Sequence, residues 1–281
     1  MLNSFAVGEF VTSKSGKQKL ADYRNNLDYC IALRTIFMSA FGENIELLVT
    51  GGAAMAFDLE DLMAQKLQIP FVTGYGMTEA CPTIAIGEKG KYKMKSVGEI
   101  VAEGIECRIE SSDPEHIPGE LIIRGDCVFT GYYKNPEATA EVIDANGYLH
   151  SGDLGVKDEQ GFYKITGRIK DMIIRGGENI YPREIEEFLY HMPGIRDVQV
   201  AAVPSKKYGE AVGAFIILEE GVKMEPEDVQ EFCRGKIARY KIPKYVFFID
   251  QFPLTGSGKI QKFKLKEMSL DLCKKFGYEV I

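Results

Sequence analysis

The first third of the chain carries short apolar runs separated by a helical pattern. An apolar run at 45–50 ends at a pair of glycines, and apolar side chains then recur at helical spacing after a capping residue, Asp58. A second apolar run at 69–73 enters Gly74-Tyr75-Gly76. Strand, helix and strand, with each strand opening into a glycine turn, predict a parallel α/β sheet. Ligands of such sheets bind beyond the carboxyl ends of the strands.

Beyond this sheet the apolar runs become shorter and glycines become frequent. Segments of β character at 97–100, 106–110 and 120–124 precede a helical segment at 136–143 and half of a hairpin at 161–166. This pattern is typical of an antiparallel block rather than of further parallel sheet.

A third pattern follows Arg168. Pro182 and Pro226 each stand at the first position of an amphipathic helical segment. Further strands are expected at 196–203, 211–218 and 245–249, followed by a glycine-containing, mobile-looking loop at 253–259.

Together these patterns predict a multidomain fold that combines α/β and α+β parts. Residues 1–95 are expected to form a parallel-sheet α/β part, and residues 96–169 an antiparallel β-rich subdomain. Residues 170–281 are expected to form a small α+β domain.

Composition narrows the class of protein. The 281 residues are 45% hydrophobic and 27% charged, which is enough for a buried core and excludes wholesale disorder. A net charge of −7 argues against nucleic acid held by bulk charge. Neither a membrane span nor a secretory leader is visible, so we expect a cytoplasmic protein. Scattered cysteines and histidines argue against a disulfide framework or a structural zinc site.

Polar side chains follow the second apolar run. Gly74 and Gly76 would let a ligand approach the backbone, while Thr78 and Glu79 could hold a phosphate oxygen and Mg²⁺. A tight turn followed by a capped helix explains the same residues equally well.

Three further features are each open to a simpler explanation. Asp153 could accept hydrogen bonds from ribose hydroxyls, although an ordinary Asx turn is the better explanation when this segment is taken alone. Arg168 could bind ribose or phosphate, or be a surface arginine. The segment 175–179 could be a hairpin turn and nothing more.

Lys259 lies on a glycine-flanked loop that invites a phosphate-loop interpretation. The P-loop pattern requires glycine and Ser or Thr where this chain has Pro253 and Ile260, so that interpretation fails. What remains is a lysine able to reach a site built elsewhere, or a solvated loop lysine.

The order of these motifs along the chain, together with their residue sequences, is far more specific for one protein family than any single motif. In chain order they are Gly52-Ala53-Ala54, Tyr75-Gly76-Met77-Thr78-Glu79, Gly131-Tyr132-Tyr133, Gly147-Tyr148-Leu149-His150-Ser151-Gly152-Asp153, Thr166-Gly167-Arg168, Gly176-Gly177-Glu178-Asn179-Ile180-Tyr181-Pro182 and Pro253-Leu254-Thr255-Gly256-Ser257-Gly258-Lys259. This series resembles the adenylate-forming superfamily of acyl-CoA synthetases, luciferases and peptide-synthetase adenylation domains. The residue sequence at 176–182 is most similar to that of fatty acyl-CoA synthetases, and the resemblance extends from about Ile45 to Lys262.

The resemblance implies an AMP-forming ligase that uses ATP, Mg²⁺ and coenzyme A. A carboxylate, here expected to be a fatty acid, attacks the α-phosphate of ATP and releases pyrophosphate. The thiol of coenzyme A then displaces AMP. The first step joins two anions, so positive charge must converge on the forming bond. The resemblance assigns that charge to Mg²⁺ and to Lys259.

The resemblance also assigns roles to individual residues. The nucleotide-binding set is Gly52, Ala53, Ala54, Gly74, Tyr75, Gly76, Met77, Thr78, Asp153, Arg168 and Lys259. Within it, the segment 52–54 lines the adenine, Tyr75 stacks near the base, and Asp153 and Arg168 bind the ribose hydroxyls. Thr78, Glu79 and Lys259 are the expected catalytic residues, with Glu79 as the Mg²⁺ ligand.

Two more assignments concern the small domain. Lys170 is the expected hinge about which this domain rotates after adenylation. The rotation withdraws Lys259 and brings Gly176, Gly177 and Glu178 to line the pantetheine tunnel of coenzyme A.

One family feature has no counterpart in the chain. The pyrophosphate-binding loop of the family is rich in Ser, Thr and Gly and should lie well upstream of Gly52. The polar segment 12–17 lacks the repeated small residues of that loop. The chain is also about half the usual family length. The resemblance therefore implies that residues 1–95 are the incomplete end of a large parallel-sheet α/β domain and that residues 170–281 are the small mobile α+β domain at its C-terminal side. We expect a C-terminal half that lacks most of the acyl pocket and self-associates through an exposed sheet edge.

Three functions stay open at this point. The residues belong to an acid–CoA ligase, to a truncated product that at most binds nucleotide or coenzyme A, or to an adenylation enzyme that loads a carrier protein. The intact Lys259, Asp153, Arg168 and Glu79 argue against long decay, and no carrier domain is visible, which favours coenzyme A.

Overall fold

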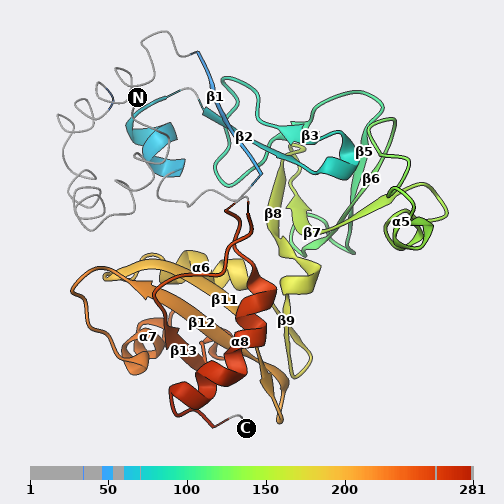
Figure 1. Cartoon of the computed structure of the whole chain (residues 1–281). Coiled ribbons are helices and arrows are strands. Elements are labelled where there is room, and N and C mark those ends of the chain that lie inside the picture. The colour runs from blue at the N-terminus through green and yellow to red at the C-terminus, as the bar shows by residue number, and fades with distance from the viewer. Residues whose placement is uncertain (1–33, 35–45, 53–59, 70, 257, 280–281) are drawn as a thin grey trace. The chain divides into compact units, whose positions relative to one another are not determined.

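The computed structural model describes residues 34, 46–52, 60–69, 71–256 and 258–279. They form two compact units, of which one ends at Ile169 and the other begins at Lys170 (Figure 1). The expected finer division at residue 95 stays a prediction. Ala53, Ala54, Asp58 and the segment 12–17 lie outside the described residues.

The first unit opens with a four-stranded sheet in the order β1-β2-β3-β4. Strands β1 (Leu48–Thr50) and β2 (Phe71–Gly76) run parallel, as the apolar runs predict, and Thr50 pairs with Thr73. Strands β3 (Thr83–Ile86) and β4 (Glu99–Ile100) extend the sheet in antiparallel fashion. A short π-helical turn, Leu62–Lys66, precedes β2 and buries Leu62 and Met63.

A second, antiparallel sheet follows in the order β5-β6-β7-β8, as expected. Its strands are β5 (Glu106–Glu110), β6 (Gly119–Arg124), β7 (Leu149–Lys157) and β8 (Tyr163–Arg168). Helix α5 (Pro136–Val142) begins as the sequence predicts, because the Asn135 side chain accepts the Ala138 N–H and Pro136 occupies the first turn. The core of this part includes Ile84, Leu121, Ile123, Leu149 and Tyr163.

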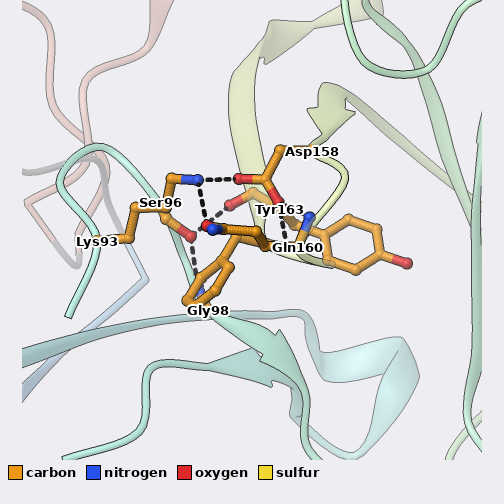
Figure 2. A network of polar contacts seen from close by, with 7 residues as sticks. Lys93, Ser96, Gly98, Asp158, Gln160 and Tyr163 are labelled. Carbon is orange, nitrogen blue, oxygen red and sulfur yellow. Dashed lines mark hydrogen bonds and ion pairs between the residues drawn. The ribbon is translucent and has the colours of Figure 1, made fainter. Parts of the chain in front are cut away.

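The segment Lys93–Gly98 fastens the two sheets of this unit to each other (Figure 2). The Ser96 hydroxyl donates to the Tyr163 carbonyl at 3.0 Å and accepts the Gly98 N–H at 2.9 Å. The Lys93 ammonium donates to Gln160 at 3.0 Å and forms an ion pair with Asp158. The turn before β8 is therefore held by the chain that leads into β4.

The second unit is built on a five-stranded sheet with the order β10-β9-β12-β11, in which β13 also pairs with β12. Its strands are β9 (Ile173–Arg175), β10 (Glu178–Ile180), β11 (Ile195–Ser205), β12 (Gly209–Leu218) and β13 (Tyr245–Phe248). Its helices are α6 (Pro182–Leu189), α7 (Pro226–Cys233) and α8 (Lys262–Lys275). Short 3₁₀ turns cover Ile169–Asp171 and Arg239–Lys241.

Helices cover both faces of this sheet, which explains the continuous apolar run of β12. Along β11, Val198 and Val200 pack with α6 and α7, whereas Ala201 and Val203 pack with α8. Side chains alternate between the two faces of a strand, so neighbouring residues of β11 belong to different cores. Both Pro182 and Pro226 stand at the first turn of their helices, as predicted.

The mixture of a short parallel pair, antiparallel sheets and a helix-covered α+β unit confirms the predicted fold class. In the part of the chain that the structure describes, no helix has the length and apolar character required to cross a bilayer.

Candidate functional site

The carboxyl ends of β1 and β2 meet at one edge of the first sheet, as expected for parallel neighbours. A Cβ atom on Gly51 would lie 3.0 Å from the Gly74 carbonyl oxygen, so the two glycine turns are in contact. Gly52 has φ +78° and is exposed. Gly74 and the half-buried Tyr75 continue β2 beyond this contact. The sequence predicted this juxtaposition correctly.

Gly76 permits a close crossing between β2 and β3. A Cβ atom at this position would lie 1.7 Å from the Pro82 carbonyl oxygen and 2.9 Å from the Thr83 Cα. The chain then leaves the sheet at Met77 and enters a 3₁₀ turn, Thr78–Ala80. A helical turn does follow the glycines, but it has only three residues and no side-chain cap.

The turn exposes Thr78 and orients Glu79. The Glu79 carbonyl accepts the Phe129 N–H at 2.8 Å, and its Oε1 accepts the Tyr132 hydroxyl at 2.9 Å. This hydrogen bond raises the pKa of Tyr132. Tyr132 belongs to the motif Gly131-Tyr132-Tyr133, but no pattern along the sequence indicates its contact with Glu79, because the two residues are 53 positions apart along the chain.

Asp153 is the central residue of a second group. It is 7% exposed, and its two carboxylate oxygens accept the Tyr75 hydroxyl at 2.7 Å and the Arg168 Nε at 2.9 Å. Arg168 reaches it because the two residues are direct cross-strand neighbours on β7 and β8. Burial, followed by the nearby Asp153 charge, raises the pKa of Tyr75, which keeps this phenol protonated as a donor.

The segment around Asp153 is part of a strand rather than a turn between elements. Residues 151–155 lie within β7, where Ser151 accepts the Asp153 N–H at 3.0 Å. The structure thus brings three predicted nucleotide residues, Tyr75, Asp153 and Arg168, into one hydrogen-bonded group. Each carboxylate oxygen of Asp153 can still accept a further hydrogen bond.

The predicted residues of the C-terminal unit lie on two tight turns. Gly176 and Gly177, with φ of +60° and +93°, join β9 to β10, as the hairpin interpretation expects. The Gly176 N–H donates to the Tyr208 carbonyl at 2.9 Å, and Glu178 is exposed at the start of β10. Lys170 is exposed in the 3₁₀ turn where this unit begins.

Lys259 lies on a loop that closes on itself. The Thr255 N–H donates to the Lys259 carbonyl at 2.8 Å, and the Lys259 N–H donates to the Thr255 hydroxyl at 3.0 Å. Leu254 and Ile260 form an isolated antiparallel β-bridge. The Gln261 amide donates to the Leu254 carbonyl at 2.7 Å. Lys259 is exposed, and its ammonium forms no ion pair with any residue that the structure describes. The loop therefore presents this lysine to solvent on a defined hairpin.

The donor chemistry near Thr78 fits the predicted magnesium ligand. Mg²⁺ in nucleotide sites takes one or two carboxylates and completes its shell with substrate phosphates and water. Glu79 offers one half-buried carboxylate, oriented by Tyr132, beside the exposed Thr78 hydroxyl. Glu79 is not part of the cluster of Glu110, Glu120 and His150, in which one carboxylate oxygen of each glutamate and one ring nitrogen of the histidine lie within 4.8 Å of one another.

Comparison with known sequences places both units in one family. The profile described as AMP-binding enzyme matches residues 9–133, and the profile described as AMP-binding enzyme C-terminal domain matches residues 184–259.

Individual relatives agree with the profiles. YngI of Bacillus subtilis, whose name as an acyl-CoA synthetase is provisional, is 46% identical over 232 residues, which is 80% of this chain and 42% of that protein. The mitochondrial medium-chain acyl-CoA ligase of Bos taurus is 44% identical over 227 residues, covering 78% of this chain and 37% of the ligase. The chain thus spans about two fifths of the length of these curated relatives.

A solved structure extends the likeness to the fold. The crystal structure of ATP-bound MatB from Rhodopseudomonas palustris has a TM-score of 0.73 and 32% sequence identity, and covers 79% of this chain and 45% of MatB. With two family profiles, close relatives and a shared fold in agreement, the chain belongs to the family of AMP-binding, adenylate-forming enzymes.

Proposed function

We propose that the protein containing this chain is an ATP-dependent acyl-CoA synthetase that acts on a fatty acid. The single observation that carries the proposal is the group formed by Tyr75 at the end of β2 in the first sheet and by Asp153 and Arg168 on β7 and β8 of the second sheet. A buried carboxylate held by two donors is pre-oriented to accept hydrogen bonds from a ribose diol. The names of the relatives support the class of reaction.

The proposed reaction has two steps. In the first, an oxygen of the fatty acid carboxylate bonds to the α-phosphorus of ATP as the bond to pyrophosphate breaks. In the second, the thiolate of coenzyme A attacks the acyl carbonyl, a thioester forms, and AMP leaves. Both steps move negative charge onto phosphate oxygens, which positive groups must stabilise.

Each predicted residue has a part in this proposal. Gly52 and the segment 53–54 line the adenine, and Gly74, Tyr75, Gly76 and Met77 border the nucleotide. Because the Tyr75 hydroxyl is bonded to Asp153, its ring is the part left to face the base. Asp153 and Arg168 hold the ribose, and Thr78 donates to the α-phosphate. Glu79 would hold Mg²⁺, which when bound neutralises charge on the triphosphate.

The C-terminal unit serves both steps through different residues. Lys259 directs its ammonium to the α-phosphate during adenylation. Rotation about Lys170 then replaces it with the turn Gly176-Gly177 and Glu178, which lines the path of pantetheine. Both glycine turns are exposed in this unit, as such an exchange requires.

We also propose an acceptor, a location and a mode of self-association for the protein. Coenzyme A is preferred over a carrier protein as the acceptor because the relatives are named as CoA enzymes. The cytoplasmic location stays a prediction, and the bovine ligase is mitochondrial. Self-association through the first sheet also stays a prediction; Val49 in β1 is 59% exposed.

A chain-length panel tests the proposed function. We expect the full-length protein, given ATP, Mg²⁺ and coenzyme A, to form acyl-CoA and AMP in equal amounts, with the highest kcat/KM on a medium-chain fatty acid. The measurement is mass spectrometry of both products across saturated acids of increasing length. Release of AMP without any acyl-CoA would argue against coenzyme A as the acceptor.

A further inference from the structure

Asp153 owes its position to a wide irregularity in β7. On either side of it, Glu120 of β6 pairs with Leu154 and Ile122 pairs with His150. One residue of β6 therefore lies opposite three residues of β7, which include Asp153 itself. Gly152, with φ +70°, supplies the left-handed conformation that such a bulge needs. Bulges are frequent next to active sites, where they re-aim a side chain.

The Glu120 carboxylate, on the neighbouring strand β6, contacts two residues of this part of β7. Glu120 accepts the Gly152 N–H with Oε1 at 2.8 Å and faces His150 Nδ1 with Oε2 at 2.9 Å. Its side chain is 16% exposed, so both bonds are largely shielded from water. Hydrogen bonds to a charged, half-buried acceptor are stronger than neutral ones. Glu120 thus hydrogen-bonds to Gly152, which immediately precedes Asp153, and contacts His150, which immediately precedes Ser151.

His150 lies among carboxylates from three parts of the sheet. Glu120 of β6 is its hydrogen-bond partner, Glu110 of β5 is the direct cross-strand neighbour of Glu120, and Asp144 precedes β7 with Oδ2 4.0 Å from His150 Nε2. The bond to Glu120, and then the charges of these groups, raise the pKa of His150. The imidazolium form therefore persists to higher pH than in an ordinary histidine.

We infer that the Glu120–His150 pair is the positioning element of the ribose site, which fixes the β7 bulge so that Asp153 meets the ribose hydroxyls. The inference rests on the proposed ribose role of Asp153. Glu120 touches no substrate in this account and acts through the backbone of Gly152. Loss of the His150 proton loosens the ion pair, so recognition of the ribose weakens as the pH rises.

The test compares two ligands that differ only in the ribose hydroxyls. Binding of AMP and of 2′,3′-dideoxy-AMP to the 281-residue chain is measured by calorimetry, and the ratio of their Kd values isolates the diol. Both ligands carry the same phosphate, so its own titration cancels. We expect the wild-type chain to prefer AMP about tenfold, the equivalent of one charge-assisted hydrogen bond.

Variants at Glu120 separate positioning from general stability. Glu120→Ala is expected to abolish the preference, as Asp153→Asn does, and the double variant is expected to lose no more than either alone. Glu120→Gln keeps an acceptor for Gly152 and so retains most of the preference near neutral pH. Glu110→Gln removes a charge one strand away but leaves the Glu120 bond to Gly152 in place, so it is expected to keep the wild-type preference for AMP at low pH and to lose it at a lower pH than the wild type, because the Glu110 charge helps to raise the pKa of His150.

The pH dependence completes the test. Between about pH 6 and about pH 9, the wild-type preference for AMP is expected to fall as His150 loses its proton, while in Glu120→Gln it stays flat. The inference would be overturned if Glu120→Ala kept the wild-type preference for AMP. It would also be overturned if the preference of Glu120→Gln fell with rising pH as that of the wild type does. A wild-type chain that does not distinguish the two ligands would overturn the ribose role of Asp153 first, and the inference with it.

Discussion

Replacing Lys259 with alanine is expected to slow adenylation by about 10²- to 10³-fold while leaving thioester formation within about threefold of the wild-type rate. The ammonium is the mobile positive group assigned to the first step, in which a carboxylate and a phosphate anion approach each other. It is exposed on a closed loop, so its removal leaves no buried cavity. The second step is assigned to the turn at Gly176, on a different part of the same unit.

The measurement uses the full-length protein and treats the half-reactions separately. Adenylation is followed as acid-dependent release of pyrophosphate, and thioester formation as consumption of a supplied acyl-adenylate by coenzyme A. Lys264→Ala is the matched control, because this exposed lysine lies five residues away on α8. Equal losses in both half-reactions would contradict the assignment of Lys259 to the first step alone.

Gly76→Ala is expected to destabilise the first unit by about 3 kcal/mol or more. The added methyl group would lie 1.7 Å from the Pro82 carbonyl oxygen and 2.7 Å from the carbonyl carbon, and both of these are backbone atoms that cannot rotate away. The strands must separate at this point, which also displaces the turn that carries Thr78 and Glu79. We therefore expect nucleotide binding to fall together with stability.

Gly74→Ala is the control for this effect. A methyl group two residues earlier on β2 would make an ordinary contact, 3.4 Å from the Ala85 carbonyl oxygen, so we expect a change of less than about 1 kcal/mol. Both variants are measured by urea denaturation followed by circular dichroism. Similar unfolding midpoints for the two variants would show that the crossing at Gly76 is looser than the structure indicates.

Much of the fold follows from local patterns in the sequence. The parallel pair β1 and β2 is predicted by two apolar runs that end in glycine, and α6 and α7 are predicted by a proline that precedes a clear apolar stripe. These signals are local, because each depends on residues within one or two turns or along one strand.

The sequence patterns do not predict helix α8, and its composition explains why. The buried side chains on this helix are Leu265, Ser269, Leu272 and Cys273, so the inward stripe is interrupted by a serine. Phe263, Met268 and Leu270 on the same helix are exposed, which blurs the helical period. The periodic signal therefore disappears, although α8 contributes Leu265, Leu272 and Cys273 to a core that it shares with β11, β12 and β13.

The sequence indicates candidate site residues but not the contacts between them. Tyr75 and Asp153 were both assigned to the nucleotide, yet their hydrogen bond joins residues 78 positions apart, and only the folded chain brings them together. The segment around Asp153 resembles a turn because Ser151 and Gly152 interrupt the alternation of β7. The role of Glu120 depends on that bulge, so no pattern along the sequence could indicate it.

The most direct test of the account is the exchange of labelled pyrophosphate into ATP by the full-length protein. This exchange reports adenylation alone, since it requires that an enzyme-bound acyl-adenylate form and revert. We predict exchange that depends on a fatty acid and is lost in both Asp153→Asn and Lys259→Ala. Fatty-acid-dependent exchange that persists in both variants would contradict the site described here, and the absence of exchange with any carboxylic acid would contradict the proposed reaction.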